Sequence, residues 1–242
     1  MFVFSNKSIN ICFTDKLHSI YPENFRQKKY SSKNLIKTEP LACLASKICS
    51  EAMLFLYQQH GDQGFAVSSI KQAKNIKPFI AKGDYIVTSA KNLAIGVVTA
   101  DCVPLILFEP YKNVLAVVHA GWRGAAMGIC QKALKTMAEE FGCSSFKNVS
   151  AFFGPSARSC CYEIKKDVLD KIMKFSFGKK TIKRRDNLYF FDNPLFISYQ
   201  LQQMGINSID FSYCVCTICS KNFCSHRRGD KKRNISIACL TT

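Results

Sequence analysis

The 242-residue sequence contains little glycine and proline and no long apolar run. Its 12 glycines and 7 prolines exclude collagen-like and low-complexity chains, and a hydrophobic content of 48% excludes intrinsic disorder. Apolar runs such as residues 103–108 are strand-sized, well short of the roughly 18 residues of a transmembrane helix. Residues 1–11 mix polar with apolar side chains and so lack the apolar core of a signal peptide. We therefore expect a soluble, cytoplasmic protein with no membrane partner.

Acidic residues are scarce relative to basic ones. The chain has 34 Lys and Arg against 17 Asp and Glu, a net charge of +17, which is a feature of nucleic-acid binders. However, the basic residues are spread along the whole chain, and the densest runs, 179–185 and 227–233, lie outside the best-patterned segments. A lysine-rich solvated surface is the favoured interpretation, and specific nucleic-acid binding is not expected.

Cysteine is abundant, but its count is odd. Thirteen cysteines without an expected export signal favour reduced thiols and metal ligands over a disulfide framework. Cys214, Cys216, Cys219, Cys224 and His226 gather near the carboxy terminus, and the last four resemble a compact zinc knuckle by ligand type. A chain with so many cysteines also produces clusters by chance. A second metal at these residues is therefore an alternative rather than the favoured interpretation.

The hydrophobic pattern predicts short buried strands interspersed with amphipathic helices, typical of an α+β fold. Near-continuous apolar strands imply a sheet covered on both faces. With neither repeat nor linker, residues 1–242 are expected to form a single catalytic domain whose first 40 residues are a variable segment. Strands and loops are expected over 1–37 and strands at 54–59, 85–89, 93–100, 104–108, 114–120, 151–153 and 209–215. Helices are expected over 41–52, 129–141, 164–175 and from 193 to about 205.

Chemistry-bearing side chains stand at the ends of predicted strands. Cys102 interrupts an otherwise continuous apolar stretch, and His119 comes near the end of the strand at 114–120. A hairpin through residues 111–113 would bring Cys102 and His119 to the same end of a sheet. His60, at another strand end, is a third candidate.

A thiolate and two imidazoles suit zinc, and three protein ligands leave a fourth position open, as in catalytic sites. On spacing alone, side chains that are merely buried or solvated are the commoner explanation. A metal-free pair of Cys102 and His119 acting as nucleophile and base is a further alternative.

The turn at residues 121–124 (GWRG) leads from a strand into a helix. Its two glycines let the backbone approach a ligand, and a helix amino terminus presents free N–H groups. Arg123 adds a bidentate donor for an oxyanion, although an ion pair with Asp101 or Glu109 is a structural alternative. An anion site beside a metal site is therefore chemically coherent.

Several strings of this sequence together resemble the YfiH-type, laccase-domain family. They are residues 99–104 (TADCVP), 119–124 (HAGWRG), 154–156 (GPS), 161–163 (CYE), 216–217 (CT) and 225–228 (SHRR). Members of this family are described as multicopper polyphenol oxidases and as purine nucleoside phosphorylases. The resemblance runs from about residue 50 to 239, with its motifs in the right order.

The resemblance implies a sandwich of mixed β-sheets flanked by helices, in α-β-β-α layers. It implies a zinc site at His60, Cys102 and His119, which would also be the catalytic residues. The implied activity is phosphorolysis of adenosine, inosine and 5′-methylthioadenosine, with adenosine deamination as a companion reaction. Purine nucleosides and phosphate would then be the small-molecule partners.

The sequence departs from the family pattern away from the three ligands. Gln59 stands where Val is usual, His226 where Tyr is usual, and Lys232–Arg233 where a Gly–Arg pair is usual. The metal assignment is unaffected, whereas substrate preference is less secure. The family pattern contains Cys216 but not the other clustered cysteines, which weakens the zinc-knuckle interpretation.

The two implied reactions need different groups. For deamination, zinc lowers the pKa of its water to about 7 and so provides a hydroxide that attacks the purine, with Asp101 either moving a proton or capping a turn. Phosphorolysis instead needs phosphate held in line with C1′ by oriented positive charge. Arg123 and Arg227 are the candidate substrate-binding residues.

Three other functions are alternatives. A copper-dependent polyphenol oxidase would use Cu²⁺, but several coppers require many histidines and the chain has 4. A Cys–His hydrolase would hold no metal. A non-enzymatic nucleic-acid binder would show affinity that collapses as salt rises.

Overall fold

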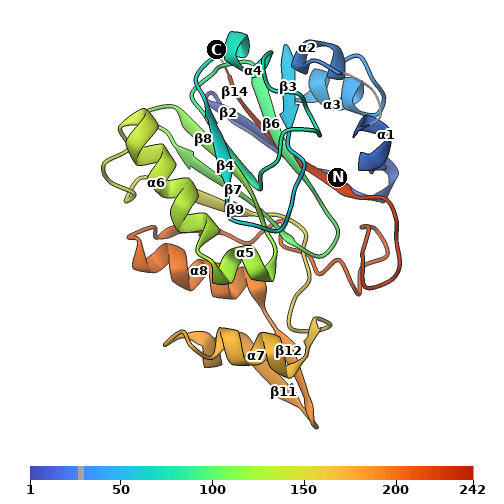
Figure 1. Cartoon of the computed structure of the whole chain (residues 1–242), viewed down its shortest axis with the longest axis vertical. Helices are drawn as coiled ribbons and strands as arrows, with labels where there is room; N and C mark the ends of the chain where they lie inside the picture. The colour runs from blue at the N-terminus through green and yellow to red at the C-terminus, as the bar shows by residue number, and fades with distance from the viewer. Residues whose placement is uncertain (27–29, 242) are drawn as a thin grey trace.

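Two β-sheets packed face to face form the centre of the protein in a computed structural model, which describes residues 1–26 and 30–241 (Figure 1). The five-stranded sheet has the order β1 (Phe2–Ser5), β2 (Ile9–Phe13), β14 (Asn234–Leu240), β6 (Leu93–Thr99) and β3 (Ala52–Phe55). The six-stranded sheet has the order β13 (Ser208–Asp210), β9 (Ser150–Phe153), β7 (Val103–Glu109), β8 (Val114–Ala120), β5 (Tyr85–Thr88) and β4 (Gly64–Val67). Both sheets mix parallel and antiparallel pairs.

The layer between the two sheets is filled by aliphatic and aromatic side chains. Ile95 of β6, Ile106 of β7 and Val117 of β8 belong to one buried cluster. Because side chains alternate along a strand, Leu105 and Val118 point to the opposite face, which the helices cover. This two-sided burial explains why β6, β7 and β8 are almost wholly apolar in sequence.

Helices cover the outer face of each sheet (Figure 1). On the six-stranded sheet lie α5 (Trp122–Ala126), α6 (Ile129–Phe141) and α8 (Asn193–Gln203). On the five-stranded sheet lie α1 (Pro22–Arg26), α2 (Ser32–Leu35) and α3 (Leu41–Lys47), while the short helix α4 (Ile70–Ala73) follows β4. The expected α+β sandwich with flanking helices is confirmed. Among the described residues, no helix is long and apolar enough to cross a membrane.

A small third sheet extends the molecule below α8 in Figure 1. It contains β10 (Glu163–Ile164), β12 (Leu188–Phe191) and β11 (Ile182–Arg185), and it lies beside α7 (Lys166–Ile172). Two short 3-10 turns, at Lys16–His18 and Gly178–Thr181, complete the elements.

The strands expected between residues 85 and 120 all form, with ends displaced by a few residues. The helix expected over 41–52 ends at Lys47, because Ala52 already begins β3. The helix expected over 164–175 begins only at Lys166, because Ile164 belongs to β10. The strand expected at 209–215 shortens to β13, and the N-terminal segment expected as strands and loops also contains α1 and α2. The assignment of residues 1–242 to one catalytic domain stays a prediction.

The chain crosses from one sheet to the other at residues 100–102. β6 belongs to the five-stranded sheet and β7 to the six-stranded sheet, and Asp101 between them has a left-handed φ of 84°. The antiparallel register of β7 and β8 pairs Val103 with Ala120 and Pro104 with His119. The crossing therefore places Cys102 beside the end of β8, as the predicted hairpin requires.

Candidate active site

Three side chains that can hold a metal meet at the edge of the sandwich. The ligand atoms of His60, Cys102 and His119 all lie within 4.8 Å of one another. The two imidazole rings are perpendicular, with centroids 4.8 Å apart. His119 is buried and follows Leu115 and Val117 on the inner face of β8, whereas His60 is exposed. The three residues predicted from the sequence to meet do lie together; their role as metal ligands and catalytic residues stays a proposal.

One buried carboxylate organises the two histidines. Asp84 accepts hydrogen bonds from the backbone N–H groups of Gln59 at 3.1 Å, His60 at 3.0 Å and Gly61 at 2.9 Å. The same carboxylate lies 2.8 Å from Nδ1 of His119. Asp84 thereby fixes both the loop that carries one imidazole and the ring of the other. Sequence reasoning missed this residue, although an acid directly before a mostly apolar strand was a usable signal.

The contact with Asp84 also decides which nitrogen of His119 is free. The carboxylate accepts a hydrogen bond from Nδ1–H of His119, so Nε2 is left to face Cys102 and His60. Burial by itself raises the pKa of the Cys102 thiol, but the charge and hydrogen bond of His119 and the contact with His60 lower it to about 6. Burial lowers the pKa of His119, but the Cys102 thiolate and Asp84 raise it to about 9. In the absence of metal, neutral pH therefore favours a thiolate paired with an imidazolium.

The donor set fits a zinc ion. Zinc binds Cys sulfur and His nitrogen in tetrahedral geometry, and a catalytic site leaves one position to water or substrate. The hydrogen bond from His119 to Asp84 is the second contact that ligating histidines commonly make. Two histidines and one cysteine also occur around copper, so these residues alone do not select the metal.

A pocket of about 470 Å³ opens over these three side chains. This volume lies within the usual range for small-molecule sites. Its wall includes four arginines, Arg26, Arg123, Arg227 and Arg233, together with Trp122, Tyr162, Asn193 and His226. The pocket therefore joins three candidate metal ligands to a wall in which four arginines outnumber the acids Glu23 and Asp101, a charge balance that suits an anionic reactant.

Arg123 stands at the start of α5, as predicted, with Gly121 as the residue before the helix. Its guanidinium lies over the ring of Trp122, 4.6 Å from the ring centre. Among the described residues, it forms neither of the two ion pairs considered from the sequence, with Asp101 or with Glu109. α5 has only five residues, so the guanidinium rather than the helix terminus is the main source of positive charge.

Arg227 borders the same pocket from the C-terminal loop. Its Nη2 donates to the carbonyl oxygen of Glu163 at 2.9 Å, and its guanidinium lies 4.9 Å from the ring centre of Tyr162. The Tyr162 ring and the Glu163 carbonyl thus orient a fork that retains further N–H donors for a ligand. The two predicted anion-binding arginines share one pocket, each beside an aromatic ring.

The carboxylate of Asp101 is occupied by neighbouring loops. It accepts from Thr217 Oγ1 at 2.7 Å, from Ser225 Oγ at 3.0 Å and from the backbone N–H of Arg227 at 2.8 Å. Of the two roles considered for Asp101, these contacts favour the structural one. Asp101 fastens the C-terminal loop to the segment that carries Cys102.

The zinc knuckle considered for the C-terminal cysteines does not form with its expected ligands. Cys224 is buried, and its backbone N–H donates a hydrogen bond to Oδ1 of Asn234. His226 borders the pocket. Cys216 and Cys219 lie instead beside Cys160 and Cys161, while Cys214 contacts Ser156. The cause is the fold: residues 156 and 216 form a parallel bridge, which sets the loop of Cys216 beside the loop of Cys160, and sequence spacing does not reveal this pairing.

Comparison with known proteins identifies the family. Residues 31–241 match the family described as multi-copper polyphenol oxidoreductase laccase. The chain belongs to this family. It is 40% identical over 154 residues to a purine nucleoside phosphorylase of Aquifex aeolicus, covering 64% of this chain and 68% of that protein. A purine nucleoside phosphorylase of Clostridium acetobutylicum is 31% identical over 179 residues, covering 73% of this chain and 71% of that protein.

Solved structures share the same fold. The hypothetical protein YfiH of Bacillus licheniformis superposes with a TM-score of 0.76 at 24% identity, covering 96% of this chain and 93% of that one. A protein of Neisseria meningitidis gives a TM-score of 0.76 at 19% identity, covering 100% and 99%. These structures confirm the fold, and the match over residues 31–241 confirms the family resemblance stated from the sequence motifs.

We expect Asp84→Asn to weaken zinc binding by roughly 10- to 100-fold, the usual cost of removing a partner of a ligating histidine. The amide keeps the size of the side chain but loses the charge and one acceptor oxygen. Competition with a chromophoric chelator measures the affinity. Asp62→Asn is the matched control, because Asp62 lies on the loop that carries His60 but pairs with Lys132. Equal affinities for Asp84→Asn and the wild type would show that the carboxylate does not organise the ligands.

Proposed function

We propose that the protein is a zinc-dependent purine nucleoside phosphorylase acting on adenosine, inosine and 5′-methylthioadenosine, with adenosine deamination as a companion activity. The observation that carries the proposal is the pocket itself. A thiolate and two imidazoles lie at its base, and Arg123 and Arg227 stand on its wall. The names of the relatives in Aquifex aeolicus and Clostridium acetobutylicum support the same reaction class.

In phosphorolysis, a phosphate oxygen forms a bond to C1′ of the ribose while the bond from C1′ to the purine nitrogen breaks. The electron pair of the broken bond leaves with the base, which then takes up a proton. The guanidiniums of Arg123 and Arg227 would hold phosphate oxygens bidentately and neutralise their charge. Each lies over an aromatic ring, so little side-chain freedom is lost when phosphate binds.

His60, Cys102 and His119 would hold the metal at the base of the pocket. A bound zinc ion would supply Lewis-acid polarisation and activate an oxygen nucleophile at neutral pH, which suits the deamination. The chain's own contribution is orientation: Asp84 holds His119 by Nδ1 and His60 by its backbone. The thiolate state of Cys102 is already favoured before metal binds, so the proton that metal binding would displace from this pair is the one on Nε2 of His119.

Two other functions make different demands of the same residues. The family description and the donor set of two histidines and a cysteine favour a copper oxidase as second candidate. Among the described residues, however, only two of the 4 histidines join a metal-binding group, which is few for several coppers. The thiolate of Cys102 beside His119 favours a metal-free hydrolase as third candidate. Metal content separates the three.

We expect Cys102→Ala to lose one equivalent of zinc relative to the wild type, because two imidazoles alone bind weakly. Elemental analysis of proteins purified without added metal checks this. Cys49→Ser is the control, since Cys49 is an exposed thiol outside the site. Stoichiometric copper in place of zinc would favour the oxidase, and unchanged zinc in Cys102→Ala would remove Cys102 from the ligand set.

We expect purine release from adenosine to require inorganic phosphate and to yield ribose 1-phosphate. Chromatography of matched reactions with and without phosphate measures both products. Inosine formed equally in the two reactions would report the companion deamination. Equal release of free base with and without phosphate would contradict phosphorolysis and indicate hydrolysis.

We expect Arg123→Lys to keep its zinc and fold but to lose about 1.5–3 kcal/mol of transition-state stabilisation, because lysine keeps the charge without the bidentate fork. Phosphate-saturation kinetics at fixed adenosine measure the loss, roughly 10- to 150-fold in kcat/KM for phosphate. Lys171→Gln is the matched control, because Lys171 also lies near the Trp122 ring but does not border the pocket. Unchanged phosphate kinetics in Arg123→Lys would assign the clamp to Arg227.

A further inference from the structure

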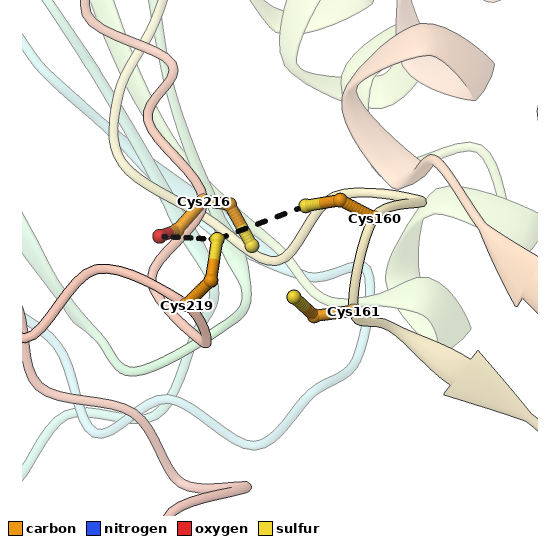
Figure 2. A group of neighbouring side chains, drawn as sticks. All are labelled: Cys160, Cys161, Cys216 and Cys219. Atoms are coloured by element: carbon orange, nitrogen blue, oxygen red, sulfur yellow. Dashed lines mark hydrogen bonds between the residues drawn. The ribbon is translucent and has the colours of Figure 1, made fainter.

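Four cysteines from two distant segments converge, as Figure 2 shows, and none of them lines the pocket. Cys160 and Cys161 are adjacent in the loop between β9 and β10, and Cys216 and Cys219 lie in the loop after β13. We refer to these residues as the four-cysteine cluster. More than fifty positions separate the two segments, so sequence spacing does not predict that they lie side by side.

The sulfur positions in the cluster are close to those of a tetrahedral metal site. All four sulfur atoms lie within 4.8 Å of one another, and the Sγ atoms of Cys160 and Cys219 are 3.9 Å apart. Zinc–sulfur bonds of about 2.3 Å in a tetrahedron place sulfurs about 3.8 Å apart. Small side-chain rotations would therefore bring the four thiolates to a common ion. The cysteines are all free, and 3.9 Å is about twice a disulfide bond length.

The backbone around the cluster is already ordered for this arrangement. The N–H of Ser156 donates to the carbonyl of Val215 at 3.0 Å, and the N–H of Thr217 donates to the carbonyl of Ser156 at 3.1 Å. These bonds hold the two loops side by side. A turn closed by the N–H of Ser220 on the carbonyl of Cys216, at 3.1 Å, brings the Cys216-x2-Cys219 pair together.

Two arginines supply positive charge beside the cluster. Arg185 donates through Nη2 to the carbonyl oxygen of Cys160 at 2.8 Å. Arg228 donates through Nη1 to the carbonyl oxygens of Ile218 at 2.8 Å and Ser220 at 3.1 Å. Four thiolates and one divalent zinc ion would carry a net charge of −2. The guanidinium of Arg185 would offset part of this charge, whereas that of Arg228 is also paired with Asp230 at 2.9 Å.

We propose that the four-cysteine cluster binds a structural zinc ion, separate from the metal in the pocket. Four cysteine sulfurs complete a tetrahedral shell and leave no position for substrate, which is the pattern of structural sites. The Zn²⁺ ion forms four bonds to sulfur as the thiols release their protons, with no change in oxidation state. Cys216 is buried, whereas Cys160 and Cys219 are exposed, so an ion can enter from solvent. This inference does not depend on the proposed phosphorylase activity.

A zinc ion here would brace the pocket wall. Tyr162, which borders the pocket, follows Cys161 directly, and Thr217, which binds Asp101, follows Cys216. The ion would thus join the loop under the Arg227 guanidinium to the loop that Asp101 fastens. Its contribution is structural, because the cluster itself does not line the pocket.

The test uses the full chain with Cys102→Ala, in which the pocket site has lost its thiolate. We expect this variant to retain one equivalent of zinc and, when loaded with Co²⁺, to show the intense visible bands and sulfur-to-cobalt charge transfer of a tetrahedral tetrathiolate. Adding Cys160→Ser and Cys219→Ser should abolish both signals. Adding Cys49→Ser instead, an exposed cysteine outside the cluster, should leave both unchanged.

Three results would overturn the proposal. Cys102→Ala protein without zinc and without the cobalt bands would show that the cluster binds no metal. Acid-labile sulfide and iron in place of zinc would identify an iron–sulfur cluster. A disulfide among the four cysteines in peptide mass mapping of unreduced protein would identify a redox pair. Because the cobalt spectrum needs no substitution in the cluster, the test holds even where the cysteine variants fail to fold.

Discussion

The carboxylate of Asp84 holds together the two parts of the chain that carry the candidate ligands His60 and His119. It lies at the start of β5 and receives three backbone N–H groups from the loop of His60, together with the ring of His119 on the adjacent strand β8. Its burial makes each of these bonds costly to break, because an unpaired buried charge has no water to replace its donors. Placement of both imidazoles therefore depends on this carboxylate.

The carboxylate of Asp101 likewise holds the C-terminal loop that contributes Arg227 to the pocket wall. At the crossing between the two sheets it has a left-handed φ of 84°, and its carboxylate receives Thr217, Ser225 and the backbone of Arg227. The thiolate of Cys102 and the guanidinium of Arg227 are thereby positioned by the same turn. The candidate ligand Cys102 and the pocket-lining Arg227 are therefore both tied to the crossing between the two sheets.

Several of the basic residues that give the chain its net charge of +17 have specific partners in the structure. Arg185 and Arg228 donate to backbone carbonyls around the four-cysteine cluster, and Arg158 pairs with Asp192 at 3.0 Å. Other arginines, Arg123 and Arg227, border the pocket. Some of the arginines thus order loops, and others line the pocket, so the basic residues are not all part of a uniformly solvated surface.

The sequence by itself determined the strands from residue 85 to 120, because they are buried on both faces and therefore almost entirely apolar. It also determined the meeting of Cys102 with His119, since a hairpin register is local. Tertiary structure alone decided the place of β14 between β2 and β6, the role of Asp84 and the pairing of Cys160 and Cys161 with Cys216 and Cys219. These features join residues far apart in the chain, and neither periodicity nor spacing encodes which distant segments become neighbours once the sheets pack.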